Sequence, residues 1–181
     1  MIINEKKYIF IPIYKSALFK FCKFETKSKD KQDIIIINAL NIKKRKKRIT
    51  YIYDETCKYI DEFYGNKNIC GFKNCKCYAN LKNGCCRKCL YKTDKGCSTK
   101  NLACKLFNCS EVYCRIKTIK FEDLRILKVL SFRQRLLVKS DYFSLRKDVL
   151  KDLYSYSITY STIRIVIRLI KNFFIVNYNQ K

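Results

Sequence analysis

Apolar side chains recur at helical spacing along the C-terminal half of the chain. Residues 119–137 are predicted to form one amphipathic helix, because these leucines fall near a common face: Leu124, Leu127, Leu130 and Leu137. A second helix is predicted to begin after Ser144, whose hydroxyl suits an N-cap, and to place these residues on one side: Leu145, Val149, Leu150 and Leu153. Residues 158–176 show alternating apolar positions as well as helically spaced basic residues, and we favour a helix.

The N-terminal half gives shorter patterns. Residues 54–64 carry an apolar side and end before Gly65, a good C-cap, so they predict a short helix. Residues 34–37 are four consecutive isoleucines, which suit either a strand or a buried helix turn. Residues 99–113 are predicted to be helical, and the glycine-containing stretch 65–98 is predicted to be a turn-rich coil.

Cysteines interrupt this pattern in the middle of the chain. Eleven of the twelve lie in the 58 residues from Cys57 to Cys114, and the chain has no histidine. Thiols this dense bind metal, pair as disulfides or carry out redox chemistry. Without imidazole, a transition-metal site must be built mainly from thiolate sulfur, which favours zinc, iron–sulfur or copper(I) over magnesium or calcium. The predicted metal ligands, in order of preference, are Cys86, Cys89, Cys97, Cys104, Cys109, Cys77, Cys70, Cys85, Cys75, Cys57 and Cys114.

The spacing of these cysteines does not select one metal. Cys86 and Cys89 form a CxxC pair, the unit that places two sulfurs on one tetrahedral ion. Cys75 and Cys77 form a CxC pair that can also chelate. The cysteine run of bacterial ferredoxins and the second CxxC of a zinc ribbon are both missing from the sequence. The expected cofactor is therefore zinc or an iron–sulfur cluster, with the grouping of ligands open.

Three segments of the cysteine-rich region carry a family resemblance: Gly84-Cys-Cys-Arg-Lys-Cys89, Lys95-Gly-Cys97 and Asn101-Leu-Ala-Cys-Lys-Leu-Phe-Asn-Cys109. They resemble small uncharacterised cysteine-rich proteins of clostridia and their relatives. More distantly, they resemble the zinc- or iron-chelating cysteine-cluster domain of bacteria, which has a CxxCxxCC motif. Here the CxxC instead follows the paired cysteines, and the arginine–proline step of that domain is missing. The resemblance implies metal binding and no catalytic activity.

The N-terminus predicts no export signal. Its apolar stretch from Tyr8 to Tyr14 is short, contains Pro12 and is soon followed by Lys15, without a small-residue cleavage site. No run of 18 uncharged apolar residues predicts a transmembrane helix. We therefore expect a cytoplasmic protein, in which reduced cysteines bind metal. A secreted disulfide scaffold remains the alternative, since the cysteine count is even.

Charge adds a second candidate chemistry. The net charge is +25, and its densest run is Lys43, Lys44, Arg45, Lys46, Lys47 and Arg48. Such a block is usually a solvated face, but it also suits nucleic acid or an anionic surface. Nucleophile motifs, a histidine base and a glycine-rich phosphate loop are missing from the sequence, so an enzyme is not the favoured class. An iron–sulfur redox enzyme stays open.

These observations predict a small α-rich, coil-rich fold whose cysteine cluster is a metal-stapled core with C-terminal helices packed on it. Three regions are expected: a basic extension (1–50), a cysteine-rich metal-binding domain with helices (51–155) and a basic amphipathic C-terminal segment (156–181). The favoured function is metal binding with a structural, sensing or metal-handling role. The alternative is a nucleic-acid-binding regulator whose metal site only supports the fold.

Overall fold

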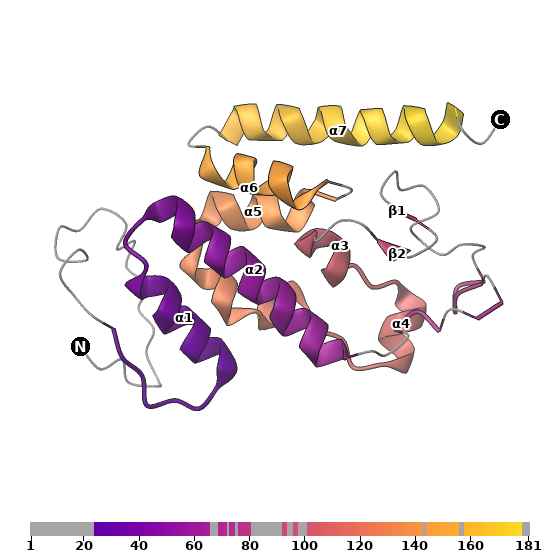
Figure 1. Ribbon diagram of the computed structural model, residues 1–181. Coiled ribbons are helices and arrows are strands. Elements are labelled where there is room, and N and C mark those ends of the chain that lie inside the picture. The colour runs from indigo at the N-terminus through magenta and orange to yellow at the C-terminus, as the bar shows by residue number, and fades with distance from the viewer. Residues whose placement is uncertain are drawn as a thin grey trace.

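The computed structural model describes residues 24–65, 69–71, 73–74, 76–80, 92–93, 96–97, 101–142, 144–155 and 158–178. Within these ranges the protein is mostly helical (Figure 1), which confirms the α-rich prediction. The α-helices are α1 (Lys31–Asn41), α2 (Arg45–Tyr64), α3 (Leu102–Leu106), α4 (Ser110–Arg115), α5 (Phe132–Ser140), α6 (Arg146–Tyr154) and α7 (Ile158–Tyr178). Two 3₁₀-helices, η4 (Phe121–Asp123) and η5 (Arg125–Val129), and a small hairpin of β1 (Lys92–Thr93) and β2 (Gly96–Cys97) complete the described elements.

The hydrophobic core includes Phe24 and one side of α1, whose isoleucines the sequence left open between a strand and a helix turn. Asp30 caps α1, since its carboxylate accepts a hydrogen bond from the Gln32 N–H at 2.7 Å. Three of the four consecutive isoleucines are buried against α2 and η5, so the strand alternative for this stretch is wrong. The core therefore includes residues that precede the predicted boundary at residue 50, and that boundary falls inside α2.

Helix α2 is longer than predicted, because it starts in the basic run and not at residue 54. Its core side repeats every three or four residues, as an amphipathic helix requires: Ile49, Ile52, Tyr53, Thr56, Cys57, Ile60 and Tyr64. It ends at the predicted C-cap, Gly65, whose φ of 57° is left-handed. Figure 1 shows α2 crossing the middle of the molecule, between α1 and the layer of α5 and α6.

The single helix predicted over residues 119–137 is wrong. The chain forms η4 and η5 there, and α5 starts only at Phe132. Ser131 and Gln134 make a reciprocal capping box, in which the Gln134 side chain accepts from the Ser131 N–H at 3.0 Å. Five residues before Ser131 are buried, and in an α-helix their spacing would spread them around most of its circumference. One long amphipathic helix could not bury all of them on a single face: Leu124, Ile126, Leu127, Val129 and Leu130.

The remaining helix predictions are partly correct. Helix α6 forms where expected, but Leu145 and not Ser144 is its N-cap residue, because the Ser144 hydroxyl hydrogen-bonds Asp141 and Arg168 instead. The stretch 99–113 contains two short helices, α3 and α4, in place of one. Helix α7 confirms the helical interpretation of residues 158–176, and Figure 1 shows it as an outer layer above α6 and α5.

Candidate cysteine-rich site and adjoining groove

Two predicted ligands, Cys70 and Cys77, lie on opposite arms of a tight turn. Lys73 and Lys76 exchange backbone hydrogen bonds of 2.9 and 3.0 Å, and Asn74 between them has a left-handed φ of 50°. One step outward, the Tyr78 N–H donates to the Cys70 carbonyl at 3.0 Å. The backbone of residues 70–78, which we call the first hairpin, therefore brings the arm of Cys70 beside the arm of Cys77.

The first hairpin is closed by a contact that requires glycine. Gly71 has φ of 56°, and a Cβ at this position would overlap the ring of Tyr78. The same ring receives the Arg115 guanidinium of α4, 4.9 Å from its centroid. Tyr78 thus joins the hairpin both to its own first arm and to the helical part of the protein.

A second hairpin, β1–β2, places another predicted ligand. Lys92 pairs with Cys97 and Thr93 with Gly96 in antiparallel register. Cys97 therefore lies opposite the arm that follows Cys89 in the sequence. The predicted ligands Cys75, Cys85, Cys86 and Cys89 lie outside the described residues, and of Cys97 only the backbone is described.

Three further predicted ligands belong to the short helices. Cys104 lies on α3 and Cys109 is the N-cap residue of α4, both half-buried, while Cys114 is exposed on α4. In the described part of the chain, no three cysteine, aspartate or glutamate side chains come together in a group that could hold a metal ion. The described residues therefore place Cys70 and Cys77 on adjacent arms of one hairpin and the other three on two successive short helices, and they form no complete site.

Cys57 has a different environment from the other cysteines. It lies on α2 in the hydrophobic core and is 4% exposed. Burial, reinforced by Asp54 and Asp61 and opposed by Lys105, raises the pKa of its thiol to about 12. The free thiol is therefore protonated at neutral pH and is a weak nucleophile.

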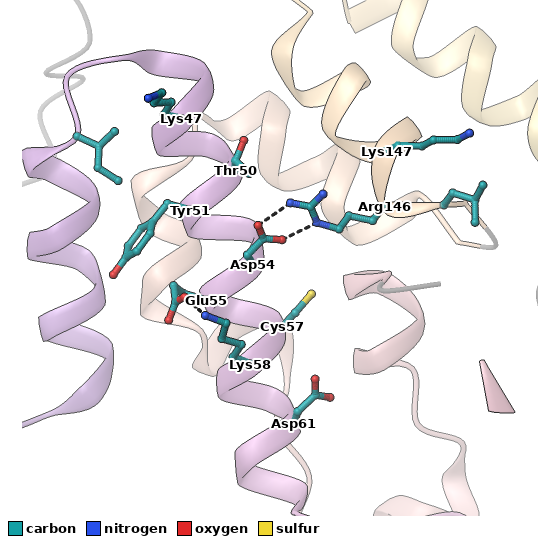
Figure 2. A pocket seen from close by; sticks show the side chains of 12 residues that line it. Lys47, Thr50, Tyr51, Asp54, Glu55, Cys57, Lys58, Asp61, Arg146 and Lys147 are labelled. Atoms are coloured by element: carbon teal, nitrogen blue, oxygen red, sulfur yellow. Dashed lines mark hydrogen bonds and ion pairs between the residues drawn. The ribbon is translucent and has the colours of Figure 1, made fainter. Parts of the chain in front are cut away.

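Cys57 also borders an open groove of about 1060 Å³ along α2. Figure 2 shows Arg146, from the start of α6, reaching across to Asp54, which it meets with two hydrogen bonds of 2.6 Å. Within α2, Lys58 pairs with Glu55 at 2.6 Å. These side chains satisfy one another, so the groove has mixed charge and no converging acid–base pair among its described residues.

The arginines and the lysines of the basic run 43–48 have different surroundings. Its two arginines bind backbone: Arg45 donates to the Tyr154 carbonyl at 2.8 Å, and buried Arg48 donates to the Ile42 carbonyl at 3.3 Å. The four lysines are exposed around the start of α2: Lys43, Lys44, Lys46 and Lys47. Any contact of this run with phosphate groups would thus be made by the lysines.

Sequence reasoning missed two buried aspartates. Asp141 and Asp152 are 1% and 0% exposed, and both pair with Arg168 of α7. Burial raises the pKa of Asp141, against the opposing effects of Ser144 and Arg168. The available signal was the helical spacing of basic residues in the stretch 158–176, which includes Arg164 and Arg168.

Comparisons of this chain with protein-family models, with curated proteins and with solved structures found no match. The resemblance to clostridial cysteine-rich proteins therefore stays a prediction. Among the helices that the structure describes, none is both long and apolar enough to cross a membrane. The functional argument rests on the residues and their geometry.

Proposed function

We propose that this chain is a metal-binding protein in which cysteine thiolates hold zinc or an iron–sulfur cluster. The metal would staple the cysteine-rich region to the helices, in a structural or metal-sensing role. Reduced thiolates are required, so we also propose a cytoplasmic location.

The observation that carries the proposal is the small amount of burial in the cysteine-rich region. Of the described residues from 69 to 80, Cys77 alone is buried. The strands β1 and β2 have two residues each. An isolated hairpin is marginal in water, and regions that lack an apolar core usually depend on metals or disulfides for stability. The density of thiols in this region supplies the means.

The positions of the cysteines on the two hairpins support the same proposal. Cys70 and Cys77 occupy facing arms of the first hairpin, and Cys75 lies between them in sequence. Thiolate metal sites commonly use ligands from such tight turns, whose backbone amides can hydrogen-bond sulfur. Lys73 and Lys76, both exposed beside these cysteines, would offset the negative charge of a thiolate site. We leave the buried Cys57 out of the proposed ligand set.

The test is elemental analysis combined with an absorbance spectrum, on full-length protein purified without oxygen. We expect bound zinc in a colourless protein, or iron with sulfide and visible absorbance. The double variant Cys70→Ser/Cys77→Ser should lose metal relative to the wild type. Its matched control is Cys57→Ser, which should keep the metal while losing stability, because it places a hydroxyl in the core.

Two outcomes would contradict the proposal. One is full metal content in the Cys70→Ser/Cys77→Ser variant, which would exclude the first hairpin from the site. The other is metal-free protein in which thiol titration finds the cysteines oxidised, which would favour the disulfide scaffold.

The exposed lysines of residues 43–47 favour a second candidate, nucleic-acid binding. They surround the start of α2, whose first turn has no acidic residue, so the lysine charges add to the positive end of the helix dipole. A binding titration of a DNA or RNA duplex should then show log K falling linearly with log salt. Replacing the four lysines by glutamine should flatten that slope, and an unchanged slope would remove the run from this role.

A further inference from the structure

Helix α7 has its apolar face turned away from the protein. These large side chains are between 47% and 66% exposed: Tyr160, Ile163, Val166, Ile167, Ile170, Phe173 and Phe174. They recur every three or four residues, so they form one continuous stripe, which we call the outer stripe. An apolar stripe of this extent on a water-exposed protein surface marks an interaction site.

The inner face of α7 is attached to the protein by buried charges. Arg168 donates to Asp141 and Asp152 at 2.7 Å each and to the Ser144 hydroxyl at 2.8 Å. Arg164 also pairs with Asp152. Buried Ile165 packs into the core on this side.

These contacts fix the rotation of α7 about its axis. Turning the outer stripe inward would pull both arginines away and leave Asp141 and Asp152 buried without their partners. Uncompensated buried charges are strongly unfavourable. The outward direction of the stripe is therefore built into the fold, and the stripe is available to an external partner.

Charge indicates what that partner is. No acidic residue follows Asp152 in the chain, and Lys171 of α7 is exposed, whereas Arg164 and Arg168 are held by the buried aspartates. The whole chain has a net charge of +25. A partner surface that combines apolar area with negative charge is complementary to α7, and an anionic lipid bilayer has both.

A second copy of the chain fits less well. Pairing two outer stripes would bring together two strongly positive molecules, and α7 has no acidic side chain to pair with Lys171 of the other copy. The stripe is also wider than the two positions per heptad that form a coiled-coil seam, because Val166 and Phe173 extend it. A broad face of this kind suits a lipid interface.

We propose that α7 docks this protein onto a bilayer containing anionic phospholipids, with the helix lying parallel to the surface. The outer stripe enters the boundary between headgroups and acyl chains, and basic side chains contact the lipid phosphates. The proposal does not depend on the metal site, since α7 contacts the protein through α5 and α6 residues.

The chain contains no tryptophan, so one introduced tryptophan reports its own surroundings. The probe is full-length protein with Ile167→Trp in the outer stripe, and the matched control is Ile34→Trp. Ile34 is 42% exposed on α1, which Figure 1 shows on the opposite side of the molecule from α7. With vesicles of phosphatidylcholine and phosphatidylglycerol, the emission of the Ile167→Trp protein should shift to shorter wavelength, and that of the Ile34→Trp protein should not. Pure phosphatidylcholine vesicles should produce a much smaller shift.

Co-sedimentation with the same vesicles provides a loss-of-binding test. The double variant Ile163→Gln/Ile170→Gln should bind the vesicles with an affinity at least about ten-fold lower, because two apolar side chains no longer leave water. Ile34→Gln should bind like the wild type.

Equal binding by the wild type and the double variant would overturn the proposal and assign binding to surface charge alone. A dimer that is lost in the double variant, without vesicle binding by the wild type, would overturn it in favour of a second copy. Absence of any wavelength shift would also overturn it.

Discussion

The helical part of the protein and the described hairpins of residues 70–97 differ in how much apolar surface they bury. In the helical part, large side chains from several elements are fully buried together: Tyr53, Ile60, Leu102, Leu127 and Leu153. In residues 70–97, the described backbone forms two minimal hairpins, and the described side chains of the first hairpin are mostly exposed. The helical part thus has a hydrophobic core, and the described residues of the two hairpins do not add to it. If the proposed metal site is correct, the chain divides its stability between apolar burial and metal cross-links.

The largest effect should come from the buried charges between α6 and α7. Asp152→Ala removes the carboxylate that pairs with both Arg164 and Arg168, which are mostly buried. We expect the free energy of unfolding to fall by about 3–5 kcal/mol, since Arg164 loses its counter-charge and Arg168 keeps only Asp141. Denaturant unfolding followed by far-UV circular dichroism measures this change. Asp148→Ala, on the same helix, is the control, and a loss equal to that of the control would contradict the importance of the pair.

A smaller effect should follow from Tyr53→Phe. The Tyr53 hydroxyl accepts a hydrogen bond from the buried Leu102 N–H at 3.1 Å and so links α2 to α3. Without it, that N–H loses its partner, and we expect a loss of about 1–3 kcal/mol. The same unfolding experiment applies, with Tyr113→Phe on an exposed site as control. Equal stability of the two variants would show that the hydrogen bond between α2 and α3 does not stabilise the protein.

The buried thiol predicts a pH dependence in the helical part. The pKa of Cys57 is about 12 in the folded protein against 9.0 for an ordinary thiol. Because the folded pKa is raised, this stabilising contribution is complete below about pH 9 and is lost as the pH rises towards 12. The stability difference between wild type and Cys57→Ala should change by at most about 1.4 kcal/mol per pH unit in this window. A constant difference from about pH 8 to pH 11 would contradict the burial of Cys57.

The smallest effect on global stability should come from Gly71→Ala in the first hairpin. Alanine is disfavoured at a φ of 56° and its Cβ would displace the Tyr78 ring. We expect the main unfolding transition to change by less than about 0.5 kcal/mol, because the hydrophobic core does not include this hairpin. Metal content should fall, as measured by elemental analysis. A large fall in the main transition would show that the two regions fold as one unit.

Periodicity predicted the fold best where a helix has one polar and one apolar face. Helix α6 and the C-terminal half of α2 follow this rule, and both were predicted close to their places. It failed over residues 119–137, because Leu124 and Ile126 are buried in different directions and Ser131 starts a new helix. It did not decide between a helix and a strand for α1, because four consecutive isoleucines are compatible with both.

Local sequence predicted the polar contacts between helices less well than the helices themselves. Ser144 was predicted to cap a helix. Its hydroxyl instead bonds to Asp141, three residues earlier, and to Arg168 on α7. The tertiary pairing of Arg168 with two aspartates depends on packing between helices, which spacing along one helix does not contain. The cysteine density indicated a thiolate site, and its ligand grouping depends in the same way on contacts between distant segments.

Hydrogen exchange followed by mass spectrometry, with and without a metal chelator, tests the central contrast most directly. We expect removal of metal to abolish protection of peptides from residues 69–100 and to leave α1, α2 and η5 protected, because their stability comes from apolar burial. Unchanged protection of residues 69–100 after complete loss of metal would contradict the proposed staple. Simultaneous loss of protection in α1, α2 and η5 would contradict the independence of the hydrophobic core.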